Sequence, residues 1–511
     1  MEEWVSGEWK MKKTEKMTGI VALAAFVAAF QGFADVDEAS LRAKKEERIR
    51  EIRSTPDMPV PPGATVYYVS SFNGDDSADG RTEKTAWRTL KRLNAEKMPE
   101  NAFVRFERGG VYRGFVRGRQ GVTYAAYGKG AKPCIVGSPE NAAVPSKWKA
   151  TDVPGIWSYR IGNRDVGTVV FDDGDTHALK VLLGTDLKTG KPVDHKRKTP
   201  FSGYRDLKGD LMFWHDYRGS GELYLVSGKN PGERFRRIEF LVRQHGFIID
   251  KVTDDVTLDN LEIRYVGAHG VSAVGICRRN LVVRNCVFEW IGGSIQTENF
   301  RGSGNPVRFG NGVEIYGGCD GYVVSNCYFR QIYDAGVTHQ YGIMEAWKVG
   351  HQKNVRYEDN VFEKCNYSVE YFLTADAANP STMENILVAR NLMFDAGFGY
   401  CRQRPDTGGS AHIKSWRGRD KKRVRNRATG FTVTDNVFCR SQDMLTETCC
   451  SLPEGDASAS LPVYSRNVFI GRKGQRFGAI SSVYVKDIRY SDDAVKLLDS
   501  RGAGNVCLFA E

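Results

Sequence analysis

The sequence predicts an all-β chain that folds as a right-handed parallel β-helix with three strands per coil. Two observations predict this fold. A phrase of apolar strand, Asn and apolar strand recurs through the second half of the chain, and its strands alternate with period two. The 54 glycines suit a chain with many turns and few long helices. The 511 residues need no division into globular domains, because a solenoid grows by adding coils.

The N-terminal segment, residues 1–34, has the layout of a signal peptide. Three lysines precede an apolar run over 20–30, and small residues follow. The ten residues before Met11 fit no such pattern, so the true start is expected at Met11. The run is too short to span a bilayer as a mature helix, although a membrane anchor is the alternative. We therefore expect a secreted or periplasmic protein with no membrane span in the mature chain.

Four further segments follow. Residues 35–63 are charged and then Pro-rich, which is typical of a linker with a short helix. Residues 64–140 are expected to form the first part of the β-helix with an N-terminal capping helix. Residues 141–244 lose the Asn phrase and hold short alternating strands, which predicts a β-sandwich-like insertion. Residues 245–511 carry the repeat and form the main β-helix.

The repeated Asn marks a corner between two strands. The residues concerned are Asn260, Asn285, Asn326, Asn360, Asn391, Asn436 and Asn467, spaced 25 to 45 residues apart. Asn tolerates the backbone angles of a sharp turn, and stacked amides can hydrogen-bond to one another, so we expect one column. The position after each Asn is apolar and includes Cys286 and Cys327. These cysteines are expected to be stacked core residues rather than reactive thiols.

A third strand follows in each coil. We align the segments 270–275, 312–317, 336–340, 368–372, 399–403 and 444–448. The inward column is then Val271, Val313, Val337, Val369, Tyr400 and Leu445. The outward column beside it is Ser272, Glu314, Thr338, Glu370, Cys401 and Thr446.

The chain resembles the secreted bacterial right-handed β-helix proteins of the pectate-lyase-like superfamily. The resemblance covers about residues 65–140 and 245–490. It rests on the repeat, on the opening phrase YYVSSFNGDDSADGRTEKTAWRTLKRLN and on VRFERGGVYRG. It implies a glycoside hydrolase or a polysaccharide lyase. The polygalacturonase signatures GHG and RIK are absent, and only His412-Ile413-Lys414 comes close, so pectin is not implied as the substrate.

Insertions are expected to form the walls of a groove along the sheet that the third strands build, as a polymer-binding site requires. They fall at 296–311, 341–353, 374–383, 403–428 and 451–460. On that sheet Glu314 and Glu370 share the outward column, with Thr338 between them. Two strand spacings separate their backbones by about 10 Å, which suits the acid and base of an inverting glycosidase. The alternative is that both are solvated surface residues.

Asp334 is the third predicted catalytic residue. It lies in the turn that enters the Thr338 strand, closer to Glu314 than Glu370 is. It would complete a retaining pair if its side chain points into the groove. Asp-Ala-Gly is also ordinary turn chemistry, which is the alternative interpretation.

Histidines and an aromatic residue are predicted to bind substrate. His269 lies at the start of the third strand of one coil, and His339 and Gln340 lie on the third strand two coils further along. His339 faces inward by strict alternation, so a hydrogen-bonded core histidine is the alternative for both rings. Trp347 lies in an insertion, where it either stacks on a sugar ring or packs the loop.

Basic residues favour an anionic substrate. Arg402 and Arg404 flank the longest insertion, and eight basic residues lie between Lys414 and Arg427. Beside a groove they would bind sulfate or carboxylate groups, although a solvated loop is the alternative. The net charge of +11 comes with no nucleic-acid motif, so a carbohydrate, acidic or sulfated, is the expected partner rather than nucleic acid.

Three functions remain open on the sequence. The first is a glycoside hydrolase acting on a poly- or oligosaccharide through two of its three candidate carboxylates. The second is a polysaccharide lyase acting on a uronate-containing glycan with Arg402, Arg404 or His412. The third is a non-catalytic glycan binder or adhesin. The 11 cysteines show no metal-site spacing, so no metal or cofactor is expected, and the oligomeric state stays open.

Overall fold

The computed structural model describes most of the chain after residue 36. The described residues are 37–196, 198–250, 253–343, 349–403, 409–416, 424–452, 458–472, 474–481, 488–489, 492–499 and 502–509. The predicted signal peptide, Trp347, Arg404 and residues 417–423 lie outside them. The chain divides into two compact units, Met1–Glu46 and Glu47–Glu511. Helix α2 (Glu38–Arg53) occupies much of the predicted linker, and its residues 38–46 belong to the first unit.

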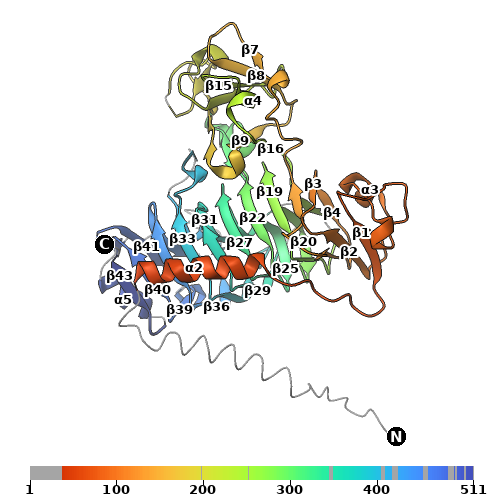
Figure 1. Cartoon of the computed structure of the whole chain (residues 1–511). Coiled ribbons are helices and arrows are strands. Elements are labelled where there is room, and N and C mark those ends of the chain that lie inside the picture. The colour runs from red at the N-terminus through yellow and green to blue at the C-terminus, as the bar shows by residue number, and fades with distance from the viewer. Residues whose placement is uncertain are drawn as a thin grey trace. The chain divides into compact units, whose positions relative to one another are not determined.

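The second unit is built on a right-handed parallel β-helix, as the sequence predicts (Figure 1). Each coil contributes one strand to each of three parallel sheets. The first sheet, before the Asn corner, contains β1 (Thr65–Val69), β2 (Ala102–Glu107), β5 (Thr123–Tyr127), β18 (Thr257–Asp259), β21 (Val282–Arg284), β26 (Val323–Ser325), β29 (Gln352–Glu358), β32 (Met383–Ala389), β36 (Ala428–Thr434) and β39 (Val463–Ser465).

The second and third sheets follow the corner. The second contains β3 (Val111–Arg113), β6 (Cys134–Val136), β19 (Glu262–Val266), β22 (Val287–Ile291), β27 (Tyr328–Ile332), β30 (Val361–Glu363), β33 (Leu392–Ala396), β37 (Val437–Ser441), β40 (Val468–Gly471) and β43 (Val506–Phe509). The third contains β4 (Val116–Gly118), β17 (Phe247–Ile249), β20 (Val271–Arg279), β25 (Val313–Asp320), β28 (Ala335–Tyr341), β31 (Tyr367–Ala375), β34 (Ala411–Ser415), β38 (Met444–Cys449) and β41 (Arg476–Ser481).

Helices close both ends of the solenoid core. Helix α3 (Leu90–Ala95) starts at Thr89, whose hydroxyl accepts the backbone N–H of Arg92, and it buries two leucines in the core. This is the predicted capping helix. At the C-terminal end, α5 (Asp492–Asp499) buries Ala494 and Leu498 in the same core.

Identical positions of successive coils stack inside the helix. The predicted inward valines of the third sheet are in register and fully buried: Val271, Val313, Val337 and Val369. In the second sheet the rings of Phe288, Phe329 and Phe362 stack with centroids 4.8 and 5.0 Å apart. Burial of these apolar columns supplies most of the driving force for coil stacking.

The Asn residues form two columns, so the prediction of a single column is wrong. The register aligns Tyr328 with Val361, which places Asn360 beside Cys327 rather than beside Asn326. The backbone N–H of Cys327 accordingly donates to the Asn360 side-chain oxygen at 2.9 Å. Cys286 and Cys327 are fully buried core residues, as predicted.

The two columns differ in their backbone. In the early coils the Asn itself has positive φ: Asn260, Asn285 and Asn326. In the later coils the residue before the Asn takes that role: Asp359, Arg390, Asp435 and Arg466. The later Asn side chains therefore turn inward and form a ladder with amide bonds of 2.9–3.0 Å that runs through Asn360, Asn391, Asn436, Asn467 and Asn505.

The outward column of the third sheet also differs from its prediction beyond Glu370. Residues Tyr400–Gln403 form a short 3₁₀ helix, in which Tyr400 packs against Trp290 and Tyr333 instead of joining the sheet. The next third strand is β34, whose Lys414 pairs in register with Glu370. Glu447 is the partner of Lys414 on the next strand of the sheet, and Thr446 lies in the inward column beside Ile413.

Residues between the first coil and the main solenoid form two packed sheets. A five-stranded sheet has the order β11 (Leu179–Lys180), β14 (Met212–His215), β15 (Glu222–Val226), β8 (Ile156–Arg160) and β7 (Lys149–Ala150). A three-stranded sheet contains β10 (Thr176–His177), β9 (Val166–Phe171) and β16 (Ile238–Val242). Tyr159, Phe213 and Phe240 share the core between them. The insertion also carries the β12 (Leu183–Thr185)–β13 (Pro192–Asp194) hairpin and α4 (Pro231–Arg234).

Three smaller strand pairs complete the described part. The hairpin β23 (Ser294–Thr297)–β24 (Val307–Phe309) projects from the solenoid. Strand β35 (Val424–Arg425) pairs with β31, and β42 (Ile488–Arg489) with β41, both antiparallel. None of the described helices has both the length and the apolar character needed to cross a membrane.

Candidate functional site

A cavity of about 560 Å³ lies on the third sheet at its early coils. This groove cavity is lined by Arg243, His245, Ala268, His269, Ser272, Val274, Gln296, Phe309, Glu314 and Tyr316. Strands β20 and β25 supply its floor, and β23 and β24 supply part of its wall. Gln296 and Phe309 of this wall belong to the first predicted insertion, residues 296–311.

The corner that enters the third sheet has a repeated pattern. His269-Gly270-Val271 and Asn311-Gly312-Val313 occupy the same place in successive coils. The glycine is required by close approach: a Cβ on Gly270 would lie 2.5 Å from the Gly312 carbonyl oxygen, and one on Gly312 would meet Gly336 in the same way. The residue before each glycine is thereby held against the next coil.

These corner residues form a polar ladder. The backbone N–H of His269 donates to His245 Nδ1 at 3.2 Å, and that of Asn311 donates to His269 Nδ1 at 3.0 Å. The Asn311 side-chain oxygen accepts the N–H of Ala335 at 2.9 Å. Since Nδ1 accepts in both histidines, each neutral ring carries its proton on Nε2. Burial lowers the pKa of His245 to about 3, which keeps it neutral.

Glu314 lies where this ladder meets the cavity. Its Oε2 accepts hydrogen bonds from His269 Nε2 and from Asn311 Nδ2, both at 2.8 Å. No described residue donates to Oε1, and Glu314 is 7% exposed and lines the groove cavity. Burial raises the pKa of Glu314, but the His269 and Asn311 contacts outweigh it and hold the pKa below its ordinary value. The carboxylate is therefore ionised, with one oxygen left to the cavity.

Glu370 lies two coils further along the same column. The register runs from Glu314 through Thr338 to Glu370, as the sequence predicts. Glu370 is 2% exposed; its Oε2 accepts from Gln340 Nε2 at 2.6 Å and its Oε1 from the indole N–H of Trp416. Thr338 is fully buried between the two acids, and its hydroxyl has no partner among the described residues. Thus Gln340 reaches a predicted catalytic acid directly.

Asp334 is placed next to, but not in, this arrangement. It is buried in the turn before β28, where its backbone N–H donates to Gly310 and its carbonyl accepts from Tyr367. Neither Asp334 nor Glu370 is among the residues that line the groove cavity. The Asp334 backbone nonetheless lies one coil from the Asn311 corner, because Ala335 bonds to Asn311.

Two further predicted substrate-binding residues lie away from the cavity. His339 is fully buried inside the coil, stacked on Tyr371 with centroids 5.7 Å apart and bonded through Nδ1 to the Tyr357 hydroxyl at 2.8 Å. Arg402 belongs to the 3₁₀ helix, and the adjacent Gln403 bonds to the insertion. Arg402 therefore does not lie on a third strand, because the aromatic packing of Tyr400 pulls this segment out of the sheet.

Sequence reasoning missed Arg243, His245 and Tyr316, which line the cavity, and Asn311, which donates to Glu314. A signal was present for two of them. His245-Gly246-Phe247 precedes His269-Gly270-Val271, and Asn311-Gly312-Val313 follows it, so the ladder repeats the pattern X-Gly-apolar. In the described residues no group of three His, Cys, Asp or Glu side chains is placed to hold a metal ion.

No protein-family model and no curated protein matches the chain. Several solved structures are similar to it. A GH136 lacto-N-biosidase from Eubacterium ramulus has 16% identity and a TM-score of 0.44, covering 84% of this chain and 57% of its own. This chain thus spans little more than half of that enzyme's length.

Two others represent different activities. A structure titled glycoside hydrolase has 10% identity and a TM-score of 0.46, covering 87% of this chain and 96% of its own. A rhamnogalacturonan lyase has 11% identity and a TM-score of 0.28, covering 88% and 83% respectively. Identities this low carry no information on the activity or the substrate of this chain.

Proposed function

We propose that the protein is a glycoside hydrolase whose reaction takes place in the groove cavity. One observation carries the proposal: Glu314 is a buried, ionised carboxylate with Oε2 held by two donors and Oε1 left to a cavity of about 560 Å³. A carboxylate held in this way is suited to take a proton from water. The cavity volume is in the range of sites that enclose a small ligand.

Glu370 supplies the second carboxylate of the proposed mechanism. It occupies the same column two coils away, about 10 Å by backbone spacing. Glu314 takes a proton from a water molecule while the water oxygen attacks the anomeric carbon. Glu370 enters the step as the neutral acid and gives its proton to the glycosidic oxygen, and the bond between that oxygen and the anomeric carbon breaks. This spacing favours inversion at the anomeric carbon.

Asp334 is the alternative partner for Glu314. A retaining mechanism needs carboxyl groups about 5–5.5 Å apart, whereas the backbone of Asp334 lies beside Gly310, four residues before Glu314. Asp334 lies in the turn before β28 and not in the outward column that Glu314 and Glu370 share, which favours Glu370. The stereochemistry of the product therefore decides between the two acids.

A lyase requires a base that removes a proton next to a uronate carboxylate. The histidines of the groove cavity are poorly suited to this, because Nδ1 of each accepts a backbone N–H and Nε2 carries the proton. Arg243 lines the same cavity and would pair with a carboxylate, so an acidic substrate remains part of the proposal.

The decisive experiment is a reducing-end assay over neutral, uronic and sulfated glycans. Release of reducing ends by the parent, lost in Glu314→Gln, supports the hydrolase. Ultraviolet-absorbing unsaturated products would indicate a lyase. Tight binding to a glycan without any new reducing ends would indicate a non-catalytic binder.

A further inference from the structure

A second cavity of about 240 Å³ lies between the insertion and the β23–β24 hairpin. Backbone N–H donors take part in the contacts between its walls: Thr185 N–H bonds to the Gly304 carbonyl at 2.8 Å, and Ile295 N–H to Asp165 Oδ2 at 2.7 Å. Ile295 lines this insertion cavity, whereas the next residue, Gln296, lines the groove cavity. These two adjacent residues of β23 line different cavities, so β23 is a wall shared by both.

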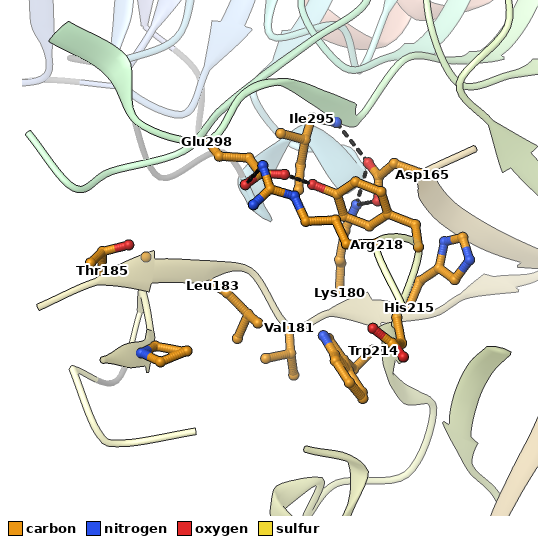
Figure 2. Close-up of a pocket in the computed structure, with 14 residues that line it drawn as sticks. Asp165, Lys180, Val181, Leu183, Thr185, Trp214, His215, Arg218, Ile295 and Glu298 are labelled. Carbon is orange, nitrogen blue, oxygen red and sulfur yellow. Dashed lines mark hydrogen bonds and ion pairs between the residues drawn. The ribbon is translucent and has the colours of Figure 1, made fainter. Parts of the chain in front are cut away.

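One wall of the insertion cavity is apolar. Figure 2 shows Val181, Leu183 and Trp214 on this side. The Trp214 ring stacks on Tyr224 with centroids 5.7 Å apart and meets Phe201 edge-on at 5.4 Å, which fixes its orientation. Throughout the described chain no acceptor is bonded to the Trp214 Nε1. A fixed N–H donor therefore lines the cavity beside apolar carbon.

The opposite wall is charged (Figure 2). Glu298 accepts hydrogen bonds from the Tyr217 hydroxyl and pairs with Arg218. The Glu298 side chain is 30% exposed, so part of the carboxylate remains available to a ligand. This pair offers a carboxyl acceptor and a guanidinium donor next to each other, the groups that bind adjacent hydroxyls.

The deeper ion pair of this cavity is structural. Lys180 Nζ donates to both oxygens of Asp165 at 2.6 and 2.7 Å and to the Val166 carbonyl at 2.7 Å, which uses all three of its protons. Both side chains are almost fully buried. The pair anchors Ile295 and leaves the cavity without a free cation at its base.

We infer that the insertion cavity is a non-catalytic sugar site that holds one neutral sugar residue. The apolar wall suits the C–H groups of a sugar ring, and Trp214 Nε1, Arg218 and Glu298 suit its hydroxyls. The Arg218–Glu298 and Lys180–Asp165 pairs carry no net charge and the Asp216 carboxylate adds a negative one, so an anionic sugar gains nothing over a neutral one. The inference rests on the proposed function in one respect, that the ligand of this protein is a glycan.

The test reads the Trp214 side chain directly. The full-length protein is labelled with 5-fluorotryptophan, and the Trp214 ¹⁹F signal is assigned by its loss in Trp214→Phe. Glucose, galactose, xylose, N-acetylglucosamine and galacturonate are titrated in turn. A neutral sugar should shift the Trp214 signal saturably, and Glu298→Gln should lower the affinity for that sugar by about tenfold. Trp157, whose Nε1 already donates to the Ser227 carbonyl at 3.0 Å, serves as the internal control and should not respond.

The results separate this inference from the proposed function. A Trp214 signal that no sugar moves, or that only galacturonate moves, overturns the neutral sugar site even if the parent cleaves a glycan. An unchanged affinity in Glu298→Gln overturns the assigned contacts. A Trp214 signal that responds in a protein with no reducing-end activity on any glycan keeps the sugar site and ends the hydrolase proposal.

Discussion

The Nε2–H of His269 donates to a carboxylate oxygen of Glu314 at 2.8 Å, although the two residues lie on different coils. The same ring accepts the backbone N–H of Asn311 through Nδ1, so the fold sets its tautomer. The relationship orients Glu314 and favours its ionised form. Each consequence for catalysis can be measured.

Glu314→Gln should lower turnover by about 10³-fold and leave the fold intact, because Gln keeps the shape and loses the proton acceptor. Turnover is measured on a glycan that the parent cleaves, and the fold by circular dichroism. Glu384→Gln is the matched control: Glu384 pairs with Lys353 on the surface of the first sheet, and its loss should leave turnover unchanged. Near-parental turnover in Glu314→Gln would remove this residue from the mechanism.

His269→Phe should move the acidic limb of the pH–activity profile to higher pH. The proposed base must be ionised, and the variant loses one of the two donors that oppose the desolvation of Glu314, so its pKa rises. Asn311→Ala should shift the limb in the same direction, since it removes the other donor. His351→Phe, a part-buried histidine outside the cavity, should leave it in place. An unshifted limb in both ladder variants would contradict the assignment of Glu314 as base.

The first product should carry the inverted configuration at its anomeric carbon, as read by ¹H NMR during early hydrolysis. This follows from pairing Glu314 with Glu370 across two strand spacings, about 10 Å. Glu370→Gln should then lower turnover by about 10²-fold or more, whereas Asp334→Asn should have a small effect. Retention, with Asp334→Asn the damaging change, would replace Glu370 by Asp334.

The free energy of unfolding should fall as pH drops from about 6.5 toward 4. Burial lowers the histidine pKa to about 3 in His245 and His339 and to about 4 in His215 and His412. The unfolded chain takes up protons near pH 6.5 and the folded chain does not, so stability is complete above 6.5 and is lost below it.

His339→Gln isolates one of these contributions. It should reduce the difference between the unfolding free energies at pH 7 and pH 4 by about 3 kcal/mol, measured from urea midpoints. Equal pH dependence in His339→Gln and the parent would show that His339 titrates normally in the fold.

Asn391→Ala should cost about 3 kcal/mol of unfolding free energy. It leaves buried partners unmatched, including the Tyr357 carbonyl at 2.8 Å and the Asn360 N–H at 3.0 Å. Asn326→Ala is the contrast: this residue has φ 53° and a part-buried side chain, so its loss should cost about 1 kcal/mol. Similar losses at both sites would mean that the two columns are energetically alike.

Local patterns were sufficient to predict the solenoid. Period-two alternation and a recurring corner residue are properties of single coils, so the three strands, the inward valines and the Glu314–Thr338–Glu370 column could be read without a structure. The change from one Asn column to the other is also visible in the sequence of single coils. Phe follows Asn285 and Asn326 by three positions but Asn360 by two.

Only the tertiary structure decided the details of the candidate site. His245, His269 and Asn311 act together because coils 24 and 42 residues apart lie on one another, and insertions of variable length hide that register. Tyr400 leaves the third sheet because Trp290 and Tyr333 offer it a buried aromatic contact. The sequence by itself determined the coil, which depends on spacing along one strand; the structure decided which side chains meet, since that depends on how neighbouring coils and the insertion pack.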